Sequence, residues 1–312
     1  MKIVVLDALT LGEDLDLTPL NSLADKVEIY QTTKPEDTID RIKSADIVVT
    51  NKVVLNRETL MMATKLKLVC ITATGMNNVD LKAAKGMGIE VKNVAGYSTH
   101  SVVQHTFTLL FTLLESICYY DEYSKSKKWS KSNLFTHLGR PFFELNGKRW
   151  GIIGLGTIGS NVAKVAQAFG CEVVYYSTSN NPHSSEYRHM DIKELLSSSD
   201  IISIHAPLNE NTDGLIDKKK LDLLKEGSII LNLGRGGIID EEALANTLNN
   251  KEIYAGLDVL TNEPPNPNHP LLNLDYPQRL CLTPHIAWTS IEARNRLFEG
   301  VLNNIKEFLE KR

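Results

Sequence analysis

Short runs of apolar residues alternate with amphipathic segments along the whole chain. In the N-terminal third these runs predict strands at residues 3–6, 27–30, 47–50, 68–71 and 89–91. Further along, strands are predicted at residues 149–153, 172–176, 201–204, 228–231, 253–257 and 279–282. Several runs are apolar throughout instead of alternating, which is typical of parallel strands covered by helices on both faces. The pattern therefore predicts an α/β fold built on parallel sheets.

Two longer segments have the period of an amphipathic helix. The first extends from residue 98 to 123 and the second from residue 290 to 309. A polar stretch with several lysines and Trp129 follows the first helix, at residues 124–142. Such a mixture occurs in nucleic-acid-binding patches, but a solvated arm between domains or at a subunit contact is favoured here.

Length and composition narrow the class of protein. The 312 residues are 42% hydrophobic and 23% charged, which predicts a globular protein of two domains. With 34 basic and 38 acidic side chains the net charge is −4, so no nucleic-acid partner is expected. Residues 1–7 hold too few apolar positions for a signal peptide, and no apolar run approaches the ~18 residues of a membrane span. We therefore expect a cytoplasmic protein without a membrane partner.

Neither cysteine nor histidine spacing indicates a metal site. The four cysteines are far apart, lack a Cys-x-x-Cys pair and have apolar neighbours, so we expect buried free thiols at Cys70, Cys118, Cys171 and Cys281. His100 and His105 are five residues apart on a predicted helix, but no cysteine or acidic residue has a matching spacing.

A glycine-rich turn follows the strand at residues 149–153. Gly154, Gly156 and Gly159 form the pattern G-x-G-x-x-G, followed by a helical segment and a second strand. In this βαβ context Gly154 permits the tight turn, Gly156 lets the backbone approach a pyrophosphate, and Gly159 allows close packing of helix on strand. The N-terminus of the helix offers free N–H groups to the phosphates. The turn therefore predicts a dinucleotide site.

The residue after the second strand sets the cofactor preference. An acidic residue is expected there to bind the ribose 2′-hydroxyl, but the position is occupied by Ser177. Repulsion of a 2′-phosphate is therefore weaker, yet no arginine is adjacent to bind one, and the nearest cations are His183 and Arg188. NAD is favoured, with NADP as the alternative.

Three further segments each follow a predicted strand, at residues 232–241, 256–264 and 282–288. They contain Arg235, Glu263 and His285. Because the carboxyl ends of parallel strands meet at one edge of the sheet, these side chains should converge beside the nicotinamide end of a dinucleotide.

Together with the glycine turn, these segments resemble in order and spacing the D-isomer-specific 2-hydroxyacid dehydrogenases. Residues 74–80 and 93–98 are also similar to family segments, and the sequence around Trp288 is most similar to the hydroxypyruvate reductase or glycerate dehydrogenase group. The resemblance implies two Rossmann-like or flavodoxin-like parallel-sheet domains. A coenzyme domain at residues 99–285 would be inserted into a substrate domain of residues 1–98 plus 286–312. It also implies a homodimer.

The reaction implied is reversible hydride transfer between NAD(P)H and a small 2-keto acid, giving a D-2-hydroxy acid, with hydroxypyruvate or glyoxylate preferred. Histidine carries a proton near neutral pH, a neighbouring carboxylate favours its protonated form, and arginine matches a substrate carboxylate. The implied catalytic residues are therefore His285, Glu263 and Arg235. The backbone at Thr74 and Gly75 is implied, with Arg235, to bind the substrate.

Cofactor contacts are implied at positions that follow the strands of the coenzyme domain. They are Gly154, Gly156, Thr157, Ile158, Gly159, Ser177, His205, Ala206, Pro207, Thr212, Leu233, Gly234 and Asp258. Two alternatives stay open. One is a D-lactate dehydrogenase, and the other is a dinucleotide-sensing, co-repressor-like binding protein without turnover, which the intact trio of Arg235, Glu263 and His285 disfavours.

Overall fold

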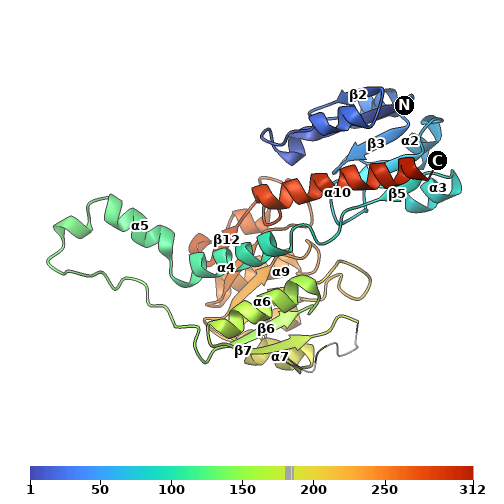
Figure 1. Cartoon of the computed structure of the whole chain (residues 1–312). Coiled ribbons are helices and arrows are strands. Elements are labelled where there is room, and N and C mark those ends of the chain that lie inside the picture. The colour runs from blue at the N-terminus through green and yellow to red at the C-terminus, as the bar shows by residue number, and fades with distance from the viewer. Residues whose placement is uncertain (180–183, 185, 312) are drawn as a thin grey trace. The chain divides into compact units, whose positions relative to one another are not determined.

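The computed structural model of the protein describes residues 1–179, 184 and 186–311. The chain forms two compact units, Met1–Ser98 with Trp288–Arg312 (unit 1) and Thr99–Ala287 (unit 2). Both termini therefore belong to unit 1 (Figure 1). The second boundary lies two residues beyond the expected residue 285. Ala287 stays with unit 2 because its N–H donates to Asp258 and its carbonyl accepts from the Ser101 hydroxyl.

Unit 1 is built on a five-stranded parallel sheet with the order β2-β1-β3-β4-β5, the flavodoxin-like order. Its strands are β1 Lys2–Val5, β2 Lys26–Ile29, β3 Ile47–Thr50, β4 Leu68–Ile71 and β5 Glu90–Lys92. Alternate residues of the central strands face opposite sides. One set packs with the short helices α1 Thr38–Ile42, α2 Arg57–Met62 and α3 Leu81–Gly86, and the other with α10 Ile291–Glu310.

Unit 2 contains a seven-stranded parallel sheet with the order β12-β11-β10-β9-β6-β7-β8. Its strands are β6 Arg149–Ile153, β7 Glu172–Tyr176, β8 Arg188–His189, β9 Ile201–Ile204, β10 Ile229–Asn232, β11 Tyr254–Leu257 and β12 Leu280–Leu282. One face packs against α4 Thr99–Leu114 and α6 Thr157–Ala168, and the other against α7 Ile192–Ser198, α8 Lys218–Leu221 and α9 Glu241–Asn250. The predicted α/β class with two parallel sheets is confirmed, although the two-residue β8 was not predicted.

The strand order of unit 2 reverses between β6 and β9. β6 pairs with the following strand β7 on one side and with β9 on the other. Ligands of open α/β sheets bind outside the carboxyl ends of the strands at this kind of switch point. The segments after β6, β9, β10, β11 and β12 carry the glycine turn, His205, Arg235, Asp258 and His285, so the candidate residues of unit 2 share one edge.

The single helix predicted over residues 98–123 is wrong, because the chain breaks after α4. A second helix, α5 Ile117–Lys125, follows at an angle of 58°. Ser116 at the break has a φ of 50°, in the left-handed region. Within the described residues no single helix has the length and apolar character to cross a bilayer, whereas the bent pair α4–α5 meets both criteria when its halves are joined.

The segment after α5 is an arm held together by aromatic contacts. The His137 ring stacks on Tyr123 at 3.8 Å and its Nε2 lies 2.7 Å from the Tyr119 hydroxyl. The Arg140 N–H donates to the Tyr120 hydroxyl at 2.9 Å. The arm also exposes Trp129, Leu134, Phe135, Leu138 and Phe142. The expected polar arm therefore also carries exposed apolar side chains.

The expectation of four buried thiols is wrong for Cys118. Cys70 and Cys171 are buried and Cys281 is half-buried, but Cys118 is exposed. The reason is its place in α5, where no side chain is buried.

Candidate active site

Each glycine of the turn after β6 has its own steric reason. Gly154 has a φ of 91°, and a Cβ there would lie 3.0 Å from the backbone of Ala206. At Gly159 a Cβ would lie 2.2 Å from the Gly154 carbonyl oxygen. Gly156 is the N-cap of α6, and a Cβ there would meet no atom of the described residues within 4 Å. The turn therefore presents the N-terminus of α6, with Thr157 and Ile158 in its first turn, to open space suited to an anion.

His205 follows β9 beside this turn. Its backbone N–H donates to the Ile153 carbonyl at 2.9 Å, but neither ring nitrogen has a hydrogen-bond partner among the described residues, and both are buried. Burial lowers the pKa of His205 to about 3, so the ring is neutral. Ala206 and Pro207 continue the loop, which Thr212 braces by donating its buried hydroxyl to the Pro207 carbonyl at 2.7 Å.

Ser177 lies directly after β7, as the sequence predicts. It is buried, and its hydroxyl lies 3.1 Å from that of Ser179. Arg188 is level with Val174 in the β7–β8 register, three residues before Ser177, and its guanidinium is 3.0 Å from Glu194. His183, the other predicted cation, lies outside the described residues.

Arg235 lies in a loop that Asn232 braces. The Asn232 Nδ2 donates to the Arg235 carbonyl at 2.8 Å, and its Oδ1 accepts from the Gly234 N–H at 3.0 Å. Leu233 and Gly234 lie between them, and a Cβ at Gly234 would be 2.7 Å from the Ala206 carbonyl oxygen. Sequence reasoning missed Asn232, although a buried amide at the end of an apolar strand is a detectable signal.

His285 and Glu263 form a direct pair. The His285 Nδ1 lies 2.6 Å from Glu263 Oε2, and Glu263 Oε1 accepts the Leu260 N–H at 3.0 Å. The side chains are 24% and 32% exposed, so the pair is open to a ligand. Because Nδ1 is engaged by the carboxylate, Nε2 is the nitrogen available to a substrate.

Asp258 anchors the segment that carries His285. It is 2% exposed and accepts three hydrogen bonds, from the Thr283 hydroxyl at 2.6 Å and from the N–H groups of Ile286 and Ala287 at 2.8 Å each. These partners lie on both sides of His285, whose φ of 55° is uncommon for a side-chain-bearing residue. The carboxylate therefore stabilises the turn that presents the imidazole.

A second carboxylate supports the turn that carries Glu263. Glu241, at the start of α9, accepts the Thr261 N–H at 2.6 Å and the Thr261 hydroxyl at 2.8 Å, and its other oxygen lies 2.9 Å from His269 Nε2. His269 Nδ1 accepts the Leu271 N–H at 3.3 Å, so the proton is on Nε2. Sequence reasoning missed both residues, because they meet Thr261 and each other only in the fold.

The predicted substrate contacts in unit 1 follow β4. Thr74 is exposed, and its hydroxyl donates to the Val94 carbonyl at 3.3 Å. The Asn93 side chain donates to the Thr74 carbonyl at 2.6 Å. Gly75 is half-buried beside it.

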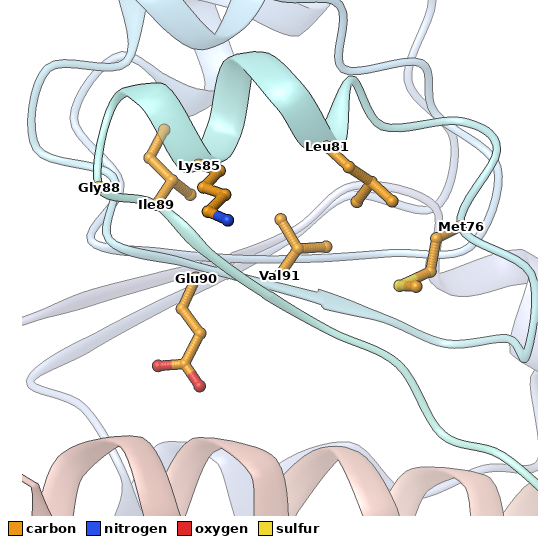
Figure 2. A pocket seen from close by; sticks show the side chains of 7 residues that line it. All are labelled: Met76, Leu81, Lys85, Gly88, Ile89, Glu90 and Val91. Carbon is orange, nitrogen blue, oxygen red and sulfur yellow. The ribbon is translucent and has the colours of Figure 1, made fainter.

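A separate hollow of about 440 Å³ lies between α3 and β5. Figure 2 shows Val91 pointing toward α3, while Glu90 points away from it on the other side of the strand. The lining is mainly apolar, with Met76, Leu81 and Ile89, and Lys85 is its one cation. None of the predicted site residues lines it.

The two histidines considered as metal ligands, His100 and His105, have different environments. His105 Nε2 lies 3.0 Å from the Thr283 hydroxyl, whereas His100 is exposed. Across the described part of the chain, no three His, Cys, Asp or Glu side chains are grouped as metal ligands.

The arrangement combines an anion-binding turn, a histidine–carboxylate pair and an arginine at one edge of a sheet. A histidine supported by a carboxylate transfers protons near neutral pH, and arginine binds carboxylates. Unit 2 is therefore equipped for proton transfer to an anionic substrate beside a bound dinucleotide.

Comparisons with known proteins agree with this chemistry. The family model "D-isomer specific 2-hydroxyacid dehydrogenase, NAD binding domain" matches residues 107–287. Hydroxypyruvate reductase of Blautia hydrogenotrophica is 39% identical, over 99% of this chain and 97% of that protein. Glycerate dehydrogenase of Methylorubrum extorquens is 35% identical, over 99% and 96%. Among solved structures, D-lactate dehydrogenase from Aquifex aeolicus, complexed with NAD and lactic acid, is similar with a TM-score of 0.86 at 25% identity, covering 100% of this chain and 96% of that one.

Proposed function

Because the chain belongs to the D-isomer-specific 2-hydroxyacid dehydrogenases, NAD(P)-dependent enzymes that reduce small 2-keto acids, we propose that its preferred substrate is hydroxypyruvate or glyoxylate. The product would be the D-hydroxy acid. The names of two relatives that match nearly the whole chain support hydroxypyruvate, and a relative named glyoxylate reductase supports glyoxylate. The observation that carries the proposed reduction of a keto acid is the 2.6 Å pair of His285 and Glu263, at the sheet edge that also carries Arg235.

The members of the trio have different roles. His285 delivers a proton from Nε2 to the carbonyl oxygen of the keto acid, since its Nδ1 is held by Glu263. Glu263 stabilises the protonated ring by its charge and fixes its orientation through the bond to the Leu260 N–H. Arg235 binds the substrate carboxylate and polarises the carbonyl. Thr74 and Gly75 supply further N–H groups for that carboxylate.

The residues at the switch point fit a dinucleotide. The open space at Gly156 leaves room for the pyrophosphate at the N-terminus of α6. At the neighbouring strand end, the two buried ring nitrogens of His205 have no hydrogen-bond partner among the described residues, which fits a site that a ligand completes. When bound, the nicotinamide supplies or accepts the hydride. Asp258 would hold its carboxamide, because Oδ2 accepts one protein N–H and keeps a lone pair.

NAD is the proposed coenzyme of choice, with NADP as the weaker one. Ser177 offers no charge to repel a 2′-phosphate. Arg188, however, lies three residues back along the strand register and is paired with Glu194, so it does not supply the missing cation.

The proposed assembly is a homodimer formed through the arm. Phe135 and Leu138 are 90% and 86% exposed, and several exposed apolar side chains on one segment are typical of an interaction surface. The hydrogen bonds and ring stacking between α5 and residues 137–140 hold this surface in shape before any contact is made. A variant with Phe135→Glu and Leu138→Glu should sediment as a monomer, whereas the wild type should sediment as a dimer.

A panel of keto acids tests the activity. We expect NADH oxidation with hydroxypyruvate and glyoxylate at a higher kcat/KM than with pyruvate. A preference for pyruvate would favour the D-lactate dehydrogenase alternative. NADH binding without turnover of any keto acid would favour the sensor alternative. The variant His285→Ala should lower kcat by about 10²–10⁴ with NADH binding retained.

A further inference from the structure

We propose that His105 is a positioning residue for His285, acting through the Thr283 hydroxyl and the Asp258 carboxylate. The inference rests on the proposed function, in which His285 delivers the proton. It gives a catalytic task to α4, a helix on which no ligand contact is predicted.

Three side chains form one continuous hydrogen-bonded chain. His105 is 14% exposed, and its Nε2 lies 3.0 Å from Thr283 Oγ1 and 3.5 Å from Asp258 Oδ1. Thr283 Oγ1 in turn lies 2.6 Å from Asp258 Oδ1. The chain links α4 to the carboxyl ends of β11 and β12, where the site lies.

The proton positions in this chain follow from the distances. The Thr283 hydroxyl has a single proton, and the Asp258 carboxylate at 2.6 Å is a better acceptor than the Leu257 carbonyl at 3.4 Å. The hydroxyl oxygen is then an acceptor toward His105, so Nε2 of His105 carries a proton. Burial lowers the pKa of His105 and the charge of Asp258 opposes that shift, so the neutral ring protonated on Nε2 completes the chain.

Asp258 transmits this contact to the catalytic turn. Thr283 precedes His285 by two residues. Ile286 and Ala287 follow His285 directly, and both donate their N–H groups to Asp258. His285 has a left-handed backbone conformation, which persists only where the surrounding contacts determine it. Loosening Thr283 therefore changes the direction of the His285 ring relative to Glu263.

Conservative and disruptive variants separate positioning from general packing. His105→Leu introduces an apolar side chain of similar size in α4 and removes the Nε2–H donor. His105→Gln keeps an N–H group near the position of Nε2. Thr283→Val removes the hydroxyl and leaves the volume. His100→Leu is the matched control, because His100 lies on the same helix and is exposed.

The experiment measures kcat and KM for hydroxypyruvate and the Kd of NADH for these variants. We expect His105→Leu to lower kcat about tenfold, with KM and the Kd of NADH within about twofold of wild type. His105→Gln should recover kcat to within about threefold, and His100→Leu should match wild type. Because His105 acts through Thr283, the double variant His105→Leu/Thr283→Val should be no slower than Thr283→Val alone.

Three results would overturn the proposal: wild-type kcat in His105→Leu, an equal loss in His105→Gln, or losses that multiply in the double variant. Failure of the proposed function is a different result, namely a wild type that reduces no 2-keto acid. In that case the pH midpoint of the His285 ring resonance, followed by NMR, replaces kcat. A lower midpoint in His105→Leu than in wild type and His105→Gln supports the positioning role, and an unchanged midpoint overturns it.

Discussion

Gly236 lies so close to Leu260 that a Cβ atom at Gly236 would be 2.1 Å from both atoms of the Leu260 carbonyl group. Gly236 directly follows Arg235, and Leu260 donates its N–H to Glu263. The loop that carries Arg235 and the turn that carries Glu263 therefore interlock at this one position.

Gly236→Ala should disturb both loops at once. The new methyl group has to displace backbone, not the end of a flexible side chain, so Arg235 and Glu263 both move. Displacements near 1 Å at reacting groups cost about 10²-fold, so kcat/KM for the keto acid should fall by about that factor, with kcat and KM both affected. Gly86→Ala is the control, because a Cβ there meets nothing within 4 Å. Unchanged kinetics in Gly236→Ala would contradict the interlock.

Glu263→Gln should shift the pH profile of reduction. Reduction needs the protonated histidine, and removal of the neighbouring negative charge lets the ring lose its proton at lower pH. The descending limb of kcat/KM against pH should therefore move toward acid. Glu242→Gln, at an exposed position in α9, should leave the profile in place. Superimposable profiles for wild type and Glu263→Gln would contradict the proposed coupling of Glu263 to the proton on His285.

Arg235→Ala should raise KM and lower kcat together. In the proposed function the guanidinium binds the substrate carboxylate and polarises the carbonyl, and loss of one such preorganised donor costs about 10²–10³ in rate. Arg235→Lys keeps the charge without the planar fork, so it should recover only part of the loss. Added guanidinium should partly restore Arg235→Ala but not His285→Ala. An effect on KM alone would remove carbonyl polarisation from the role of Arg235.

Ser177→Asp should widen the preference for NADH over NADPH. A carboxylate after β7 can bind the ribose hydroxyls of NAD and repels the 2′-phosphate of NADP. The ratio of the two kcat/KM values should therefore rise, mainly through a loss with NADPH. Ser197→Asp, at an exposed position in α7, serves as a charge-matched control. If the ratio does not change, the adenosine ribose does not lie at Ser177.

Thiol labelling should separate the cysteines by burial. Burial raises the pKa of Cys70 to about 12 and that of Cys171 to about 11, so neither forms appreciable thiolate at a labelling pH of about 8. At most two thiols should react in the native protein, and Cys118→Ser should remove the exposed one. Labelling of Cys70 before unfolding would contradict the packing of β4.

The sheets were predictable because several of their strands, β3 and β4 among them, are continuous or nearly continuous apolar runs. Strands β3, β4, β6, β7 and β9 have the predicted bounds, and the glycine turn and His285 follow the strands named for them. The break between α4 and α5 was not predictable, because the apolar period continues past Ser116 and neither glycine nor proline interrupts it. The two-residue β8 is too short to give any pattern.

The sequence predicts that the proposed trio lies at one sheet edge, but it does not predict most of the contacts that support these residues. Arg235, Glu263 and His285 stand in segments that follow strands, so topology alone brings them to one edge. Asn232 supports Arg235 at a spacing of three residues, but Glu241 meets His269 across 28 residues and His105 meets Thr283 across 178. Contacts of that separation depend on how α4 and α9 pack on the sheet, which no local pattern of the sequence contains.

The position of α10 has a consequence for synthesis of the protein on the ribosome. Its side chains Phe298, Val301, Ile305 and Phe308 cover the face of the unit 1 sheet formed by residues such as Ile3, Val5, Ile47 and Val49. The strands of that sheet are translated before unit 2, whereas α10 is translated after all of unit 2. At about 5–20 residues per second, an apolar sheet face waits uncovered for on the order of ten seconds or more while the intervening segment is made. During that interval the nascent unit 1 sheet exposes an apolar face of the kind that chaperones bind.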